Sequence, residues 1–310
     1  MEIGSHGSGV TITRGHRALL LVAAALTYLL VTLGGVVCIT DASRGCPDWP
    51  ACYGQLLPPP RVDSVLEYAH RVLAALTSIS IVVSAVLGWR RTRAVRWISW
   101  PPVLAVGFLV IVIILGAMVV LRGLEPGLAA LDLGSALIVL ALMLAAALVA
   151  AVPRRQPTVL TRLAWDSPYA RLAAGTLVAV FAVLVSAVLV ADEGSLVRCL
   201  GWPLVSERWL RGDLRGWLQA ARWLLSAMAS LLIVALVVEA WRTQRHQPTI
   251  VRAATAAGVV LLVEILVGLL LPLFEFAIPL LVVYVALAAA LWALLVALVV
   301  LTGLSGAWPS

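Results

Sequence analysis

Eight apolar runs, each long enough to cross a lipid bilayer as a helix, constrain this chain more than any other feature. A helix needs about 20 apolar residues to span a hydrocarbon core of about 30 Å. Such runs occupy residues 18–40, 67–89, 98–121, 128–152, 172–191, 218–241, 253–272 and 278–302. A mean hydropathy of +1.06, with 63% hydrophobic and 12% charged residues, excludes a soluble domain with a solvated surface. The sequence therefore predicts an all-α integral membrane protein with eight transmembrane helices.

The arginines predict how these helices are oriented, because the cytoplasmic loops of membrane proteins collect positive charge. Arginines gather before the first run and between the second and third, fourth and fifth, and sixth and seventh runs: Arg14, Arg17, Arg90, Arg91, Arg93, Arg96, Arg154, Arg155, Arg162, Arg171, Arg242, Arg245 and Arg252. We therefore expect a multi-pass protein of the cell membrane with both termini cytoplasmic and the long loops, about 41–66 and 192–217, extracytoplasmic. The formal charge of +7 reflects this bias and contact with anionic membrane lipids, so no nucleic-acid binding is inferred.

The two halves of the chain carry landmarks in the same order, which predicts an internal duplication. Trp49-Pro50 is echoed by Trp202-Pro203 and Cys46 by Cys199 at an offset of 153. At an offset of 152 the pairs are Glu67 and Gln219, His70 and Arg222, Gly116 and Gly268, and Asp132 and Tyr284. We expect two tandem four-helix bundles: an N-terminal bundle at 1–152, a cytoplasmic linker at 153–171 and a degenerate C-terminal bundle at 172–310.

Cys46 and Cys52 flank two prolines in the first long loop, on the side of the membrane where disulfides persist. The gap between them is easily bridged, and the prolines stiffen the turn. Two interpretations stay open, a static staple of the loop and a reversible dithiol beside a redox centre. Cys38, at the outer end of the first run, is expected to be a small buried hydrophobe, while Cys199 has no close partner in its own loop.

Glu67 and His70 lie three residues apart at the start of the second run, hence on one face of a helix. Ionisable groups at such depth usually point into a bundle. An imidazole there can ligate a heme iron, and a carboxylate one turn away can accept protons or position a water. A mutually satisfied polar pair is the alternative. Arg71 could pair with a heme propionate or extend to the lipid headgroups.

The loop CPDWPACYGQLLPPP and the helix start EYAHR resemble the heme A synthases of the respiratory oxidase assembly pathway. The resemblance implies an oxidoreductase that converts the methyl group of heme O to the formyl group of heme A, with oxygen from water. It implies Glu67 as catalytic acid or base, His70 as axial ligand of the heme iron, and Cys46 with Cys52 as an electron-accepting or stabilising disulfide. It also suggests heme O synthase, the terminal oxidase and a second copy of the chain as partners, and heme b as an alternative bound heme.

Three of the four heme-facing histidines of that family are missing here. The matching positions hold His70, Asp132, Arg222 and Tyr284, while the other histidines, His6, His16 and His246, fall in the predicted inner tail or loop. A bis-histidine heme in the second half is therefore not expected. Asp132 could hold a water or proton opposite His70, or mark a lost heme site. Tyr284 is a possible heme ligand, but we favour a contact with Arg222, and the buried Glu264 is either a proton relay or a partner for Arg222.

Three functions fit these features. The favoured one is a heme A synthase-like enzyme, because Glu67 and both loop cysteines are present together. The second is a non-catalytic heme-binding or oxidase-assembly protein. The third is a membrane thiol:quinone oxidoreductase that uses Cys46 and Cys52. The sequence contains no Walker loop, dinucleotide-binding glycine pattern or HExxH motif, which excludes a pump with its own ATPase.

Overall fold

The computed structural model describes residues 12–55, 57–122, 125–151, 163–190 and 214–306. These residues form a short 3-10 helix, η1 (Ala42–Arg44), and the long helices α1 (Arg14–Ile39), α2 (Val62–Arg91), α3 (Arg96–Arg122), α4 (Pro126–Ala151), α5 (Pro168–Val190), α6 (Leu214–Thr243), α7 (Pro248–Leu270) and α8 (Ile278–Gly306). All eight α-helices are long and apolar enough to span a membrane. Such helices satisfy their own backbone hydrogen bonds, as a bilayer requires. The all-α membrane fold with eight transmembrane helices is therefore confirmed.

Several helices extend beyond the apolar runs that predicted them. α2 begins at Val62, because a polar first turn with Asp63 precedes the apolar run and an acidic side chain favours a helix N-terminus. Glu67 consequently lies in the second turn of α2, not at its start. α5 begins at Pro168, inside the predicted linker 153–171, because proline suits the first helical position. The Ser167 hydroxyl also accepts the Ala170 N–H at 3.1 Å there.

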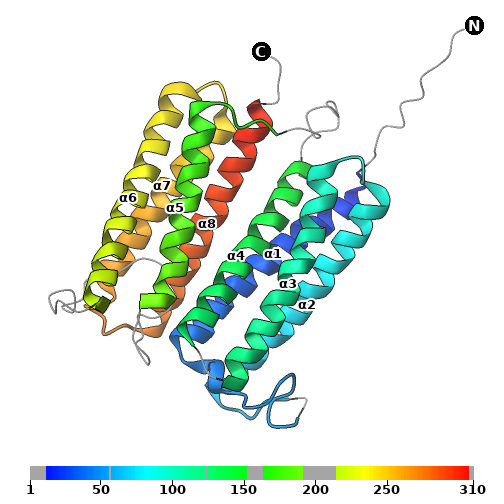
Figure 1. Ribbon diagram of the computed structural model, residues 1–310, viewed down its shortest axis with the longest axis vertical. Helices are drawn as coiled ribbons and strands as arrows, with labels where there is room; N and C mark the ends of the chain where they lie inside the picture. Colours follow the sequence, from blue (N-terminus) through cyan, green and yellow to red (C-terminus); the bar gives the residue numbers. More distant parts are fainter. Residues whose placement is uncertain (1–11, 56, 123–124, 152–162, 191–213, 307–310) are drawn as a thin grey trace, which may run out of the picture.

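The helices form two sets that run side by side (Figure 1). In the first set the contacts run α1 to α2, α2 to α3, α3 to α4 and α4 to α1, so α2 and α4 lie diagonally opposite. In the second set they run α5 to α6, α6 to α7, α7 to α8 and α8 to α5, so α6 and α8 lie diagonally opposite. Side chains on diagonal helices can therefore face each other across the centre of each set.

The two sets meet where α1 and α4 pack against α5 and α8. Between described residues, two side-chain hydrogen bonds cross this interface. The Tyr28 hydroxyl of α1 donates to the Ala286 carbonyl of α8 at 3.1 Å, and Nε1 of Trp292 in α8 donates to the Leu137 carbonyl of α4 at 3.0 Å. Because hydrogen-bonding groups in the membrane have no water as an alternative partner, these bonds help to hold the two sets in one relative position.

Gly35 allows α1 to approach α8 at this interface, which leads to the first prediction. A Cβ at Gly35 would clash with Cγ1 of Val285, a β-branched side chain with little freedom to move. We expect Gly35→Ala to lower the free energy of unfolding by about 1–3 kcal/mol, the usual cost of overpacking. Thermal unfolding of the detergent-solubilised protein measures this loss.

Two further variants control for that effect. When it is combined with Gly35→Ala, Val285→Ala removes Cγ1 and should recover most of the lost stability. Gly107→Ala should not lower stability, since a Cβ at Gly107 would meet no atom within 4 Å. Loss of the same size in Gly35→Ala and Gly107→Ala would contradict a tight α1–α8 contact.

Candidate functional site

The cysteines of the first long loop form a disulfide that lies against the start of α2. Cys46 and Cys52 are bonded, with Cα atoms 4.7 Å apart, and both are fully buried. The Ser64 hydroxyl of α2 donates to the Gly45 carbonyl at 2.7 Å. The disulfide is therefore anchored beside the first turn of the helix that carries the predicted site.

Asp48 holds the chain segment that follows Cys52. Its carboxylate accepts the backbone N–H groups of Tyr53 at 2.6 Å and of Gly54 at 2.7 Å. Tyr53 has a φ of 55°, a conformation that non-glycine residues seldom adopt, so these hydrogen bonds support an unfavourable backbone geometry. The pKa of Asp48 lies below its usual value. The largest cause is the hydrogen bond from Gly54, followed by the hydrogen bond from Tyr53 and the charge of Arg71.

Arg71 connects the disulfide loop with Glu67. Its Nε donates to Oε1 of Glu67 at 2.9 Å, and the two side chains are only 11% and 6% exposed. Its other nitrogens donate to loop carbonyls, those of Cys46, Asp48, Pro50 and Ala51. A guanidinium can do this because it presents five donors in a fixed planar fork. Apolar patterning could not reveal these loop contacts, and the expected contact of Arg71 with a heme propionate stays a prediction.

His70 points toward α1 from the face of α2 that also carries Glu67. A Cβ at Gly34 of α1 would lie 3.1 Å from Cε1 of His70, so the glycine leaves room for the ring. Nδ1 of His70 is buried and has no hydrogen-bond partner within the described part of the chain. Buried polar atoms are normally bonded, so an unpartnered imidazole nitrogen is a candidate for a bound group.

Asp132 and Thr32 carry further unpartnered atoms at a similar depth. Oδ1 of Asp132 in α4 and Oγ1 of Thr32 in α1 are buried without hydrogen-bond partners. His70 is eight residues beyond the first residue of α2, Asp132 six beyond that of α4, and Thr32 seven before the last of α1. At 1.5 Å per residue, all three lie about 9–12 Å from the helix ends next to the disulfide loop. The first set therefore has one level rich in unsatisfied polar atoms.

The second set has different side chains at the equivalent level. Arg222 is eight residues into α6 and Tyr284 six residues into α8, the same positions as His70 and Asp132 in α2 and α4. Arg222 is 4% and Tyr284 1% exposed, and the two lie close enough to interact electrostatically, while the expected direct contact between them stays a prediction. Both carboxylate oxygens of the fully buried Glu264 lack a hydrogen-bond partner among the described residues, so of its two interpretations the pairing with Arg222 is not found, and the proton relay stays a prediction.

Two other features differ from the sequence expectations. Cys38 is disulfide-bonded, so its description as a small buried hydrophobe is wrong; an even count of four cysteines was the available signal. His16 lies within α1, not in the tail, because α1 starts at Arg14; it is buried, and neither ring nitrogen has a partner. Cys199, the loop at 192–213 and the first part of the linker lie outside the described residues.

Comparison with known proteins identifies the family. The model of a family described as "Cytochrome oxidase assembly protein" matches residues 17–66 and 61–296. The chain belongs to the cytochrome oxidase assembly protein family.

Curated relatives within this family carry the name heme A synthase. The Geobacillus thermodenitrificans protein is 28% identical over 254 residues, which cover 81% of this chain and 80% of the relative. The Bacillus licheniformis protein is 25% identical over 234 residues, 74% and 77% of the two chains. The Geobacillus kaustophilus protein is 27% identical over 253 residues, which cover 80% of this chain and 79% of the relative. The resemblance seen in the loop and the α2 motif is therefore confirmed across most of the chain.

The second prediction tests the bond between Arg71 and Glu67. Arg71→Gln leaves the buried Glu67 carboxylate without its cation, so we expect it to lower the free energy of unfolding by about 3–5 kcal/mol. Chemical or thermal unfolding in detergent measures the change. The double variant Glu67→Gln/Arg71→Gln should lose less stability than Arg71→Gln alone.

The matched control is Arg61→Gln, which breaks the exposed pair with Asp63, where the side chains are 62% and 34% exposed. Its cost should stay within about 1 kcal/mol, as for other surface ion pairs. Similar losses in Arg61→Gln and Arg71→Gln would show that Arg71 is not a buried clamp.

The third prediction concerns the pH dependence of the loop. Because the folded-state pKa of Asp48 lies below its usual value of 3.8, its stabilising effect is complete above that pH and is lost as the pH falls through the folded pKa. We expect Asp48→Asn to speed reduction of the Cys46–Cys52 disulfide by a phosphine at neutral pH. The ratio of the reduction rate of the variant to that of the wild type should approach one in acid. Alkylation of the released cysteines followed by mass spectrometry measures both rates. Glu275→Gln, in the α7–α8 turn, should give a ratio near one at every pH; a pH-independent ratio for Asp48→Asn would contradict the assignment.

Proposed function

We propose that this protein is a heme A synthase, which oxidises the methyl group of heme O to the formyl group of heme A for assembly of a terminal oxidase. Its family and its curated relatives support a heme-modifying membrane enzyme. The observation that carries the finer proposal is the pairing on one face of α2 of Glu67 with His70, whose Nδ1 has no hydrogen-bond partner. An acid or base and an iron ligand thus lie one helical turn apart.

The residues of the first set fit heme O as the substrate. His70 would hold the iron, because a neutral imidazole is a common heme ligand, and Gly34 leaves space beside its ring. Asp132 lies at a similar depth on the diagonal helix, where Oδ1 would take a proton or a water opposite His70. In the second set the corresponding residues, Arg222 and Tyr284, interact electrostatically with each other. We therefore propose a single heme, in the first set.

Glu67 would handle the protons of the reaction. Conversion of a methyl group and a water molecule to a formyl group releases four protons and four electrons. Arg71 donates to Oε1 of Glu67, so Oε2 is the oxygen left to accept a proton from the reacting water. Arg71 also keeps the carboxylate in place, because its guanidinium is bonded at the same time to the loop carbonyls. Glu67 is thus the proposed catalytic base and Arg71 a positioning residue.

The disulfide next to this pair is proposed to be mainly stabilising. Cys46 and Cys52 are fully buried, whereas a dithiol that exchanges electrons with a quinone or another protein must be accessible. A disulfide can accept only two electrons, so the four released per turnover require another acceptor. These points argue against the thiol:quinone alternative.

By the positive-inside pattern, the disulfide loop and the heme level would lie near the outer face of the cell membrane. Heme O would reach the site from heme O synthase, and heme A would pass to the terminal oxidase. The following experiment distinguishes an inactive heme carrier from a heme-modifying enzyme.

The fourth prediction uses Glu67→Gln and His70→Ala, co-expressed with a heme O source and compared by heme extraction and visible spectroscopy. The wild type should yield formyl heme. Glu67→Gln should keep bound heme O while heme A formation falls at least 100-fold, in line with loss of a general base. His70→Ala should lose the bound heme of the first set.

Arg61→Gln, at the exposed start of the helix, serves as the control and should make heme A at the wild-type level. Heme O binding without conversion in the wild type would support a carrier instead. Heme A formation by Glu67→Gln at the wild-type rate would remove Glu67 from the mechanism.

A further inference from the structure

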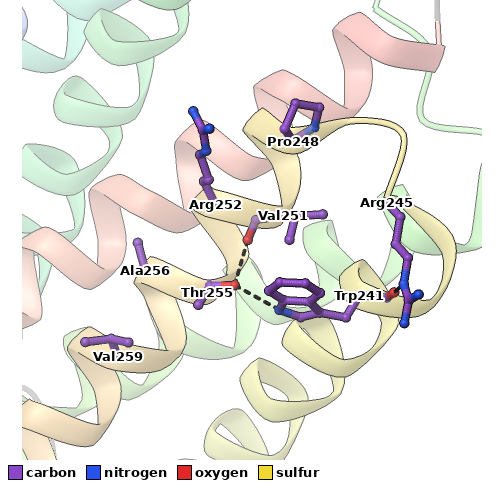
Figure 2. A pocket seen from close by; sticks show the side chains of 8 residues that line it. All are labelled: Trp241, Arg245, Pro248, Val251, Arg252, Thr255, Ala256 and Val259. Carbon is purple, nitrogen blue, oxygen red and sulfur yellow. Dashed lines mark hydrogen bonds between the residues drawn. The ribbon is translucent and has the colours of Figure 1, made fainter.

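A groove between α6 and α7 lies at the end of the helices opposite the disulfide loop. It has a volume of about 730 Å³ and is lined by Trp241, Arg245, Pro248, Val251, Arg252, Thr255, Ala256 and Val259. Figure 2 shows Arg245, in the turn between α6 and α7, and Arg252 of α7 on either side of Trp241. The groove lies at the other end of the helices from the level of His70 and Asp132, and it plays no part in the proposed reaction.

The floor of the groove is fixed by contacts between the two helices. Nε1 of Trp241 donates to the Thr255 hydroxyl at 3.1 Å, and that hydroxyl donates to the Val251 carbonyl at 2.8 Å (Figure 2). Deeper in the membrane the helices come close together, because a Cβ at Gly258 would lie 2.9 Å from Cγ2 of Val237. The space between the two helices is thus closed at the level of Gly258.

The charge of the groove is positive and localised at its rim. Arg245 and Arg252 are exposed, and the lining residues include no acid. Glu239, the nearest acid on α6 within the described residues, is not among the residues that line the groove. Nε of Arg245 donates to the Trp241 carbonyl at 2.5 Å, which leaves its two terminal nitrogens for a ligand. Two guanidinium groups without an acid among the lining residues, beside an apolar wall, favour a ligand with an anionic head and an apolar tail.

The apolar wall continues from the charged rim along α7. Arg252, Ala256 and Val259 are spaced by four and three residues, which places them on one face of the helix. Val259 lies about 10 Å deeper than Arg252 at 1.5 Å per residue. The small side chain of Ala256 leaves this path open between them. A phosphate held at the rim would therefore have its acyl chain directed along the lipid-facing side of α7.

We propose that this groove binds an anionic phospholipid of the cytoplasmic leaflet, with its phosphate on Arg245 and Arg252 and an acyl chain along Ala256 and Val259. Basic sites between membrane helices on the cytoplasmic side are the general setting for such headgroups. Trp241, hydrogen-bonded in the floor, supplies the rigid interfacial surface on which the glycerol region rests. The lipid would bridge the ends of α6 and α7 and stabilise the second set.

The test is native mass spectrometry of the full-length protein, delipidated in detergent and then offered equal amounts of phosphatidylglycerol and phosphatidylcholine. The wild type should retain phosphatidylglycerol preferentially. Arg252→Gln should reduce that retention about fivefold, the effect of about 1 kcal/mol per arginine at a membrane surface. Arg245→Gln/Arg252→Gln should reduce it on the order of 25-fold. Phosphatidylglycerol should raise the unfolding temperature of the wild type but not of the double variant.

Three controls distinguish lipid binding in this groove from the general attraction of anionic lipid to a basic protein. Arg90→Gln removes an exposed arginine from the end of α2 outside the groove and should keep wild-type retention. Ala256→Trp fills the acyl path but keeps both arginines, and should reduce retention as well. Inorganic phosphate, which has no acyl chain, should not displace the lipid. Equal retention of the two lipids by the wild type, equal phosphatidylglycerol retention by wild type and double variant, or a dimer that the double variant dissociates would each overturn the proposal.

Discussion

The absence of water from the bilayer core is the constraint on which this structure depends. Each backbone group there must find its partner within the protein, and the eight long helices meet this demand segment by segment. Polar side-chain atoms that remain unpartnered inside the helices therefore stand out as costly. His70, Asp132 and Thr32 carry such atoms at one level of the first set. A cost of this kind persists where a bound group or a reaction supplies the missing interaction, which is why we propose that the heme binds there.

The disulfide loop is part of this site, since Arg71 joins it to Glu67. One guanidinium bonds a buried carboxylate and several loop carbonyls at once, so the position of Glu67 depends on a correctly closed loop. Asp48 contributes from the other side by holding Tyr53 and Gly54. The cysteines can thus influence catalysis through geometry, without exchanging electrons themselves. The burial of both sulfurs agrees with this interpretation.

The two helix sets use equivalent positions for different chemistry. His70 and Asp132 in the first set correspond in helix position to Arg222 and Tyr284 in the second. A guanidinium has no free lone pair and stays protonated, so it cannot replace an imidazole as an iron ligand; it can interact with a phenol, as it does here. Our proposal therefore gives the second set the role of a support for the first, held to it by bonds such as that from Tyr28 to Ala286. A lipid between α6 and α7 would strengthen this support at the opposite face.

The sequence by itself determined the number of membrane helices, because apolar length is a property of each segment alone. Its short spacing also made Cys46 and Cys52 easy to bridge, and the structure bonds them; the roles of Glu67 and His70 stay predictions. The sequence could not reveal the contacts of Arg71 with the loop, since these join residues some twenty positions apart through a turn whose path apolar patterning does not encode. It also misjudged Cys38 and the start of α1 at Arg14, because polar helix ends and distant disulfide partners leave no hydrophobic signal. Which polar atoms lack partners was decided only by the tertiary structure. Burial and hydrogen bonding depend on what the other helices bring to the same level.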